Sequence, residues 1–231
     1  MNTPNNTQNN IPLYQKEFYE SFYNNKSLND FLSQRMVQQL ITLGAADEMM
    51  LDVQQEIKSS MRVLQLGITF GPLIQYVAER VSSKGQYDIV DTNITQIQRA
   101  KSEYCIYPMV NIIQHNAENF YDKDYDVIIC YNLLHEVPLP AKTKIVDTAL
   151  SSIAKGGKVI FVDYHRPVWY HPFRYFIRMF NRLYQPFAEK LWDVEISAFS
   201  EKSTSFKWRK TTYSGRMYQK VVVTKKENTN Q

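Results

Sequence analysis

The sequence predicts an α/β fold in which helices cover both faces of a doubly wound, mostly parallel β-sheet. Between residues 61 and 162, short apolar segments of strand length alternate with amphipathic segments of helix length. That alternation is typical of a parallel sheet, because the crossover between neighbouring parallel strands is usually a helix. Glycine turns support it: Gly67 and Gly71 follow the first apolar segment, and "AKGGK" precedes the fifth.

The two ends of the chain differ from this central region. Residues 1–12 are rich in Asn and lack the basic start and apolar core of a signal peptide, and residues 225–231 are equally polar. Both are predicted to be disordered tails. Residues 13–58 are predicted to form an N-terminal helical segment with a stop at Gly44. The residues that follow a helical period there are Leu28, Phe31, Leu32, Arg35, Met36 and Leu40.

Residues 59–165 are predicted to form the α/β core. The expected strands are 61–67, 86–92, 109–116, 125–134 and 157–165, and the expected helices are 72–81, 94–104 and 141–154.

Residues 166–224 are predicted to form a C-terminal lobe that covers the substrate site and completes the sheet with a strand at 217–225. The lobe opens with an aromatic and basic helical insertion at 172–184. This helix either packs into the core, or grips a hydrophobic substrate and touches anionic lipid through its arginines. Its apolar face comprises Phe173, Phe176, Ile177, Phe180 and Tyr184, and its basic flank comprises Arg174, Arg178 and Arg182.

Composition restricts the class of protein. Hydrophobic residues make up 44% of the 231 residues, and no apolar run approaches the length of a membrane span. The net charge of +4 suits an anionic substrate or a membrane surface, but it is too small to indicate nucleic-acid binding. Cys105 and Cys130 lack the spacing of metal ligands, and we expect two reduced, packed thiols in a cytoplasmic protein.

The candidate cofactor site lies at the carboxyl ends of the predicted strands, where open α/β sheets bind ligands. Gly67 and Gly71 would let the backbone approach a cofactor, although alone they indicate no more than a tight turn. Asp91 ends the second strand, next to Thr92, and its carboxylate could accept both hydroxyls of a ribose. The set is completed by Gln65 on the first strand, Asn116 and Ala117 after the third, and Tyr131 with Asn132 at the end of the fourth.

In this order the motifs resemble the class I S-adenosylmethionine-dependent methyltransferase superfamily, over roughly residues 60–165. The resemblance rests on the strand, glycine turn and helix, the acid on the second strand, "HNAEN" after the third and "KGG" before the fifth. A dinucleotide-binding Rossmann enzyme fits less well, because it would prefer three glycines. The resemblance implies a class I methyltransferase-like fold that binds S-adenosylmethionine.

Longer segments resemble the rhodoquinone biosynthesis family, RquA: "RVLQLGITFG", "LLHEVP", "VDYHRPVWYHPFRY", "QPFAEKLW" and "GRMYQKVVV". This resemblance implies conversion of ubiquinone to rhodoquinone, in which an amino group from S-adenosylmethionine replaces a methoxy group of the quinone. It also implies support by Mn²⁺. A hydrophobic quinone must be collected from a membrane, so we expect a peripheral position on its inner face.

Two clusters at the same sheet edge are candidates for the chemistry. His135 and Glu136 follow the fourth strand, and residues 163–166 follow the fifth. Any one of these side chains could instead cap a loop, but together they offer a base, metal ligands and donors to a quinone oxygen. We assign His135, Asp163 and His165 as candidate catalytic residues and Tyr164, Arg166 and His171 as candidate substrate-binding residues. The metal ligands stay open, with Glu136 and Asp163 as candidates.

Gln65 stands where the superfamily usually has a carboxylate. A carboxylate would favour the charged ammonium of the cofactor, whereas an amino donor must lose a proton before it attacks. A neutral amide is therefore what amino transfer would require, although Gln65 could equally be a drifted position without chemical meaning. The alternatives to quinone amination are a true methyltransferase acting on a small lipophilic molecule or quinone precursor, and a non-catalytic binding protein.

Overall fold

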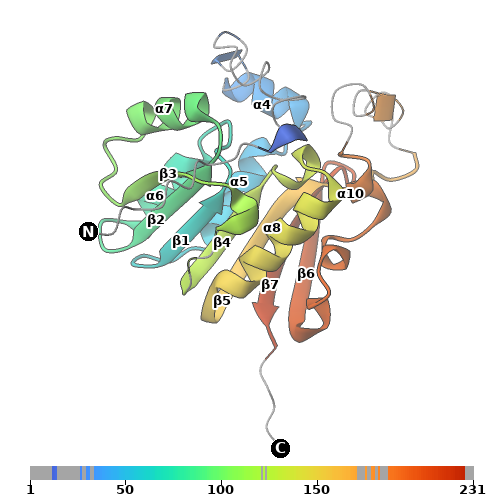
Figure 1. Cartoon of the computed structure of the whole chain (residues 1–231). Coiled ribbons are helices and arrows are strands. Elements are labelled where there is room, and N and C mark those ends of the chain that lie inside the picture. Colours follow the sequence, from blue (N-terminus) through green and yellow to red (C-terminus); the bar gives the residue numbers. More distant parts are fainter. Residues whose placement is uncertain are drawn as a thin grey trace, which may run out of the picture.

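The structure is a computed structural model that describes residues 12–14, 27, 30–31, 34–120, 122, 124–170, 175, 178–179, 182 and 187–226 (Figure 1). The helices are α4 (Arg35–Ile41), α5 (Ala46–Gln55), α6 (Leu73–Val81), α7 (Ile94–Glu103), α8 (Leu139–Ser152) and α10 (Lys190–Asp193). The strands are β1 (Arg62–Leu66), β2 (Gln86–Asp91), β3 (Val110–Gln114), β4 (Tyr125–Tyr131), β5 (Ile153–Tyr164), β6 (Phe206–Tyr213) and β7 (Tyr218–Lys225). Short 3₁₀ turns are η1 (Ala117–Asn119), η2 (Leu134–Glu136), η3 (Ile196–Phe199) and η4 (Ser203–Ser205).

Seven strands form one sheet in the order β3-β2-β1-β4-β5-β7-β6. The first five strands pair in parallel, and β7 pairs antiparallel with both β5 and β6. The strand order reverses between β1 and β4, so the loops after these strands diverge at the switch point where ligands of such sheets bind. The predicted doubly wound, mostly parallel α/β fold is confirmed.

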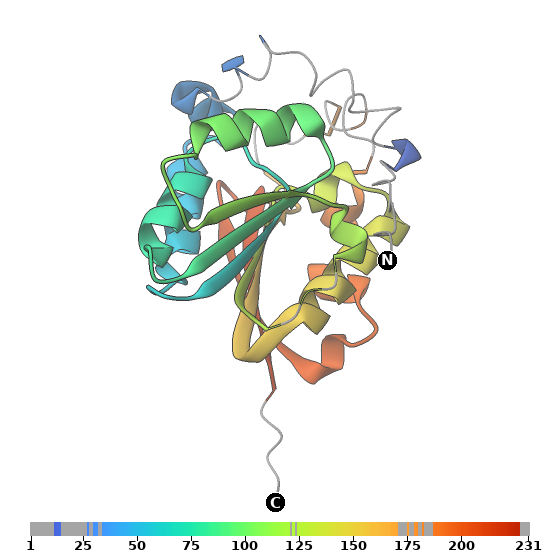
Figure 2. The same ribbon diagram turned by 60° about the vertical axis from the view of Figure 1, so that its left-hand side comes forward.

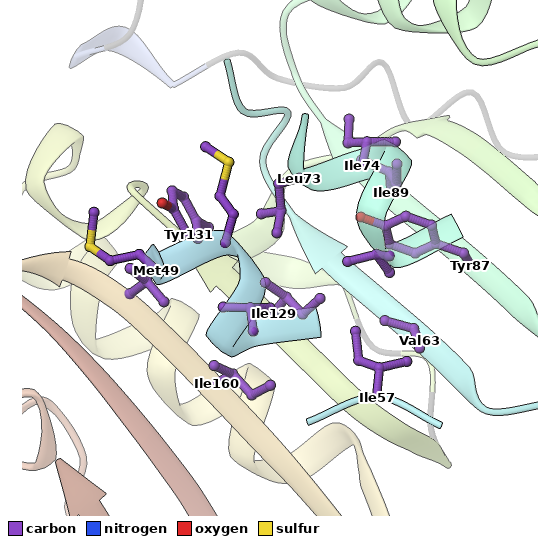
Figure 3. Packing of buried hydrophobic residues seen from close by; sticks show 14 of the residues in the cluster. Met49, Ile57, Val63, Leu73, Ile74, Tyr87, Ile89, Ile129, Tyr131 and Ile160 are labelled. Carbon is purple, nitrogen blue, oxygen red and sulfur yellow. The ribbon is translucent and has the colours of Figure 1, made fainter. Parts of the chain in front are cut away.

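Helices cover both faces of the sheet (Figure 2). On one face, α5, α6 and α7 pack over a cluster in which Val63, Ile129 and Ile160 point from successive strands (Figure 3). On the other face, α8, α10 and η3 pack over Leu64, Ile128 and their neighbours. Adjacent strand residues thus alternate between the two clusters, as the two-residue period of a strand requires. Both faces are buried, which explains why the strands read as continuous apolar runs.

Strand β6 was not predicted from the sequence. Its residues read "FKWRKTTY", and all but the first and last are at least partly exposed. An edge strand faces solvent along one side and carries charges that discourage pairing with other chains, so it shows little apolar pattern. The predicted strand at 217–225 is present as β7, and β6 lies outside it at the edge of the sheet.

The segment "AKGGK" does not form the predicted turn before the fifth strand. α8 ends at Ser152 rather than at 154, and β5 begins at once, with Ile153 opposite Tyr125. The pairing with β4 then shifts, which leaves residues 154–157 as a bulge. A side chain on Gly157 would place its Cβ 2.8 Å from the carbonyl oxygen of Tyr125, so glycine is needed there.

The helical pattern at the N-terminus does not mark core residues. Phe31, Met36 and Leu40 are all largely exposed, and α4 stands beyond the end of the sheet (Figure 1). Most of the predicted 172–184 helix lies outside the described residues, but its described members Tyr175 and Met179 are also exposed. Within the described part of the chain, no helix combines the length and apolarity needed to cross a bilayer.

Candidate functional site

The loop between β1 and α6 has the backbone geometry of a ligand-binding turn. Gly67 and Gly71 have φ values of +84° and +86°, which cost a residue with a side chain roughly 1–2 kcal/mol. Gly67 donates its N–H to the carbonyl of Val90 on β2 at 2.8 Å. A Cβ on Gly67 would lie 3.5 Å from the Leu133 side chain, so this loop adjoins the segment after β4.

Gln65 is fully buried beneath this loop, and its amide is bound on both sides. Its Nε2 donates to the carbonyl of Gly67 at 2.9 Å, and its Oε1 accepts a hydrogen bond from the hydroxyl of Tyr87. A carboxylate could not donate to that carbonyl. The amide therefore has a structural reason to be there, apart from any effect on a cofactor amine.

Asp91 lies where a ribose-binding acid was predicted, and it also holds the glycine loop. Its Oδ2 accepts the N–H of Ile68 at 2.7 Å, and its Oδ1 accepts the N–H of Asn93 at 2.8 Å. Burial raises the pKa of Asp91, and these backbone donors, with that of Thr92, oppose part of the shift. Three backbone donors leave one of the roughly four lone-pair sites of the carboxylate for a ligand.

The remaining predicted cofactor residues have internal contacts. Asn116 caps η1 by accepting the N–H of Glu118 at 2.9 Å, and Ala117 packs against the α8-side cluster. Thr92 is buried next to Asp91. Tyr131 does not form an open floor, because its ring is buried near Met49 in the cluster beneath α5 (Figure 3).

Two loops at this edge hold buried oxygens that are without a hydrogen-bond partner among the residues that the structure describes. They are Oγ1 of Thr69, in the glycine loop, and Oδ1 of Asn132, directly after β4. Asn132 has a φ of +54°, and its N–H donates to Val162. An unsatisfied buried polar atom is costly, and at a ligand site the usual explanation is a partner supplied by the ligand. These atoms and the remaining lone pair of Asp91 fit a polar cofactor such as S-adenosylmethionine.

Beside the loop, Asp163 organises the turn that carries His135. Asp163 is fully buried at the end of β5, and its Oδ1 lies 2.8 Å from Nδ1 of His135. Its Oδ2 accepts the N–H groups of Leu134 at 2.8 Å and of His135 at 3.3 Å, and its Oδ1 also accepts that of Tyr164. Since a carboxylate accepts, Nδ1 carries the proton and Nε2 presents a lone pair.

The surroundings of His135 set its basicity. Its ring stacks on Tyr164, with the ring centres 4.3 Å apart, and its Nε2 lies 3.9 Å from the Glu136 carboxylate. Burial lowers the pKa of His135, but Asp163 and then Glu136 raise it by more, so the net shift is upward. A buried imidazole held in one tautomer by a carboxylate is the arrangement of a general base.

His165 does not join this pair. Its Nδ1 lies 3.0 Å from the carbonyls of both Arg166 and Arg216, and its Nε2 lies 3.3 Å from Nζ of Lys210. Lys210 in turn pairs with Glu195. Nε2 must then accept from the lysine ammonium, and burial lowers the pKa of His165, so this histidine is a neutral structural link. Arg166 is exposed, and His171 lies outside the described residues.

The predicted manganese site does not fit these contacts. Both oxygens of Asp163 accept hydrogen bonds within the protein, and the group is fully buried, which leaves Glu136 as the other predicted ligand. No cluster of three or more His, Cys, Asp or Glu residues able to bind a metal occurs in the part of the chain that the structure describes. The packing expectation for cysteines holds for buried Cys130 but not for exposed Cys105.

Lys142 is a buried residue that the sequence analysis missed. Its Nζ, on α8, donates to the carbonyls of Val137 and Phe187, the latter at 3.0 Å, and so joins the turn after His135 to the C-terminal lobe. Burial lowers the pKa of Lys142 to about 8. The sequence could have indicated that Lys142 is buried, because it lies beside Ala141 and Ile145 on the buried part of the helical pattern.

Comparisons with known proteins agree with this architecture. Residues 63–157 match a family model described as "Methyltransferase domain". A methyltransferase of Aquifex aeolicus, described as S-adenosylmethionine-dependent, shares 16% identity at a TM-score of 0.59, covering 85% of this chain and 96% of its own. The N-methyltransferase NodS of Bradyrhizobium japonicum, in complex with S-adenosylhomocysteine, shares 11% identity at a TM-score of 0.61. The match covers 93% of this chain and 98% of NodS. An O-methyltransferase family protein of Burkholderia thailandensis shares 13% identity at a TM-score of 0.65. The match covers 91% of this chain and 64% of that protein.

No curated protein matches the sequence. At such low identities the solved structures establish the fold, which is that of class I methyltransferases. The segment matched by this family model includes the glycine loop, Asp91 and the His135 turn. Together these findings agree with a transferase that has the methyltransferase fold.

Proposed function

We propose that the protein is an S-adenosylmethionine-dependent methyltransferase whose acceptor is a small lipophilic molecule with a weakly acidic hydroxyl or similar group. The main support for this proposal is the buried His135–Asp163 pair. It joins the end of β5 to the turn that lies next to the glycine loop. The match of residues 63–157 to a methyltransferase domain supports it independently.

The residues around the glycine loop are suited to bind the cofactor. Thr69 and Asn132 provide buried oxygens that still lack partners within the described residues, and the Asp91 carboxylate keeps one lone pair for a ribose hydroxyl. The positive φ values of Gly67 and Gly71 keep the loop backbone open to a ligand. When bound, S-adenosylmethionine supplies an electrophilic methyl group.

The His135–Asp163 pair is suited to prepare the acceptor. Nε2 of His135 would remove the acceptor's proton, and the new imidazolium would be stabilised by Asp163 at 2.8 Å and by Glu136 at 3.9 Å. Asp163 also fixes the ring through the N–H groups of Leu134 and His135, so little reorganisation is needed. The stacked Tyr164 offers an aromatic surface for a flat, apolar acceptor.

Amino transfer to ubiquinone, giving rhodoquinone, is a second candidate function. It is favoured by the resemblance to the rhodoquinone biosynthesis family and by the neutral Gln65, which places no carboxylate under the glycine loop. The quinone would be drawn from a membrane, in keeping with a peripheral position on its inner face. The contacts described above do not support manganese, so neither candidate is assigned a step through a metal.

One product assay separates the two candidates. The purified full chain is incubated with S-adenosylmethionine and either lipophilic phenols or a short-chain ubiquinone, and the products are identified by mass spectrometry. Methyl transfer predicts gain of one methyl group and release of S-adenosylhomocysteine, whereas amino transfer predicts loss of a methoxy group and gain of an amino group. Absence of any product across the panel, with S-adenosylhomocysteine still bound, would favour the non-catalytic alternative.

The variant His135→Gln provides the control for chemistry. Loss of a positioned general base typically lowers kcat by about 10²–10⁴-fold. Because His135 is assigned to the acceptor rather than to the cofactor, affinity for S-adenosylhomocysteine should be retained in calorimetry. A variant that keeps full activity would contradict the assigned role.

A further inference from the structure

Five large apolar side chains are exposed near the carboxyl edge of the sheet, on two segments that are distant in sequence. Met36, Leu40 and Leu43 lie in and after α4, with exposed fractions of 82%, 75% and 41%. Trp169 and Tyr170 follow β5, with exposed fractions of 80% and 69%, and their rings meet edge to face at 5.5 Å. Single exposed apolar residues are ordinary, but a contiguous group indicates a binding surface.

The turn between β6 and β7 joins these two segments. Ser214 donates its hydroxyl to the carbonyl of Thr42, which immediately precedes Leu43, at 2.7 Å. On its other side, the carbonyl of Gly215 accepts the N–H of Val168, next to Trp169, at 3.0 Å. The end of α4, this turn and the segment after β5 are therefore neighbours in space. We call the surface formed by Met36, Leu40, Leu43, Trp169, Tyr170 and Arg216 the apical surface.

Positive charge accompanies the apolar side chains. Arg216, in the connecting turn, and Arg166, after β5, are both exposed. Neither forms an ion pair with a carboxylate within the described residues. Arg178 and Arg182 are exposed as well, and Arg178 lies 3.7 Å from the Glu189 carboxylate. Aromatic and aliphatic side chains beside exposed arginines are the combination that the interfacial region of an anionic membrane binds.

The backbone indicates that the exposed Leu43 is not there for stability. Its φ is +51°, a conformation in which a leucine is strained and a glycine is not, and Arg216 has a φ of +68°. Each position thus holds a large side chain at an energetic cost to the fold of roughly 1–2 kcal/mol. A role outside the folded core, such as contact with another surface, accounts for both residues.

We propose that the apical surface docks the protein onto an anionic lipid bilayer. The alternative occupant, a second copy of this chain in a symmetric contact, would bring the same arginines face to face and is disfavoured by like-charge repulsion. The glycine loop and the His135 turn also lie at the carboxyl edge of the sheet. Docking would therefore bring the candidate site near the bilayer. The proposal does not rest on which group is transferred.

Vesicle co-sedimentation tests this proposal with the full chain and without any acceptor. The probes are vesicles of phosphatidylcholine alone and of phosphatidylcholine mixed with phosphatidylglycerol. Wild-type protein should sediment with the mixed vesicles, and much less with phosphatidylcholine alone or at high salt. Failure to bind the mixed vesicles at low salt would overturn the proposal, whether or not the product assay above succeeds.

Two sets of substitutions locate the surface. Trp169→Ser with Met36→Ser removes apolar anchors, and Arg216→Gln should weaken binding roughly fivefold, the effect of one surface arginine. The matched control, Ile106→Ser with Lys84→Gln, alters an exposed apolar and an exposed basic residue before β3 and β2, at the opposite edge of the sheet. All these side chains are exposed, so melting temperatures should not change.

The variants distinguish the outcomes. Binding that is lost in the apical variants and kept in the control supports the proposal. Equal binding by all variants would overturn it, as would a wild-type protein that dimerises through this surface in sedimentation velocity and ignores vesicles.

Discussion

Nδ1 of His135 lies 2.8 Å from Oδ1 of Asp163, and both side chains are almost completely buried. Asp163 accepts three backbone N–H groups as well, so its carboxylate is fixed before any substrate arrives. The pair joins the ends of β4 and β5, and β4 borders the switch point of the sheet. Its position and its single tautomer make His135 the candidate general base of this site.

The pH dependence of activity should report the raised pKa of His135. A base must be neutral to act, so kcat/KM should rise with pH, with a midpoint above the ordinary histidine value of about 6.5. Glu136→Gln removes one of the carboxylates that raise this pKa, so the midpoint should move to lower pH. The measurement is kcat/KM against pH for both proteins. A midpoint that does not move would contradict the assignment of His135, and Glu201→Gln, a substitution of an exposed residue, is the control.

Thr69→Val should separate cofactor binding from stability. The Thr69 hydroxyl is buried without a partner among the described residues, so its removal breaks no hydrogen bond in the free protein. The melting temperature without ligand should stay the same or rise, whereas affinity for S-adenosylhomocysteine should fall roughly 2- to 12-fold, the value of one hydrogen bond. Calorimetry and thermal melting give the two quantities. Unchanged affinity would show that the hydroxyl does not face the cofactor.

Tyr87→Phe should destabilise the protein through Gln65. The Tyr87 hydroxyl is the donor to the buried Oε1 of Gln65, and an unsatisfied buried acceptor costs about 1–3 kcal/mol. For a domain of this size each kcal/mol lowers the melting temperature by about 2–4 °C. Tyr107→Phe, which removes an exposed hydrogen bond to Glu79, is the control and should change little.

Gln65→Glu tests the chemical interpretation of the same residue. The carboxylate would lose the hydrogen bond to the Gly67 carbonyl, so some loss of stability is expected whatever the reaction. If amino transfer is the activity, turnover should also fall by more than cofactor affinity does, because a carboxylate favours the protonated amine. A turnover that falls no more than the affinity for the cofactor would leave Gln65 with only its structural role.

Lys142→Met should remove part of the dependence of stability on pH. The lysine has a pKa of about 8 when folded and about 10.4 when unfolded, so the unfolded state binds more protons between these values. The free energy of unfolding of the wild type should therefore increase relative to that of the variant as pH rises from about 8 toward 10. Lys144→Met, a change of an exposed lysine on the same helix, should keep the wild-type slope. Parallel curves of melting temperature against pH for all three proteins would contradict the lowered pKa.

The sequence was sufficient to predict a site residue where its position depends only on the strand that carries it. Asp91 ends β2 as predicted, because the apolar run of that strand stops at the first residue able to face a ligand. The partners of Gln65 and His165 could not be predicted in this way. Tyr87 reaches Gln65 from the neighbouring strand, and Lys210 reaches His165 from β6, an edge strand with no apolar signal of its own. Contacts of this kind depend on the register and order of strands, which local patterns do not encode.

Hydrogen exchange with and without S-adenosylhomocysteine tests the central claim most directly, since it needs no knowledge of the acceptor. The ligand should slow exchange in residues 67–71, 91–93 and 132–136, the three loops at the carboxyl edge, and leave the opposite edge of the sheet unchanged. Protection confined to other segments, or no protection at ligand concentrations that saturate related enzymes, would contradict it.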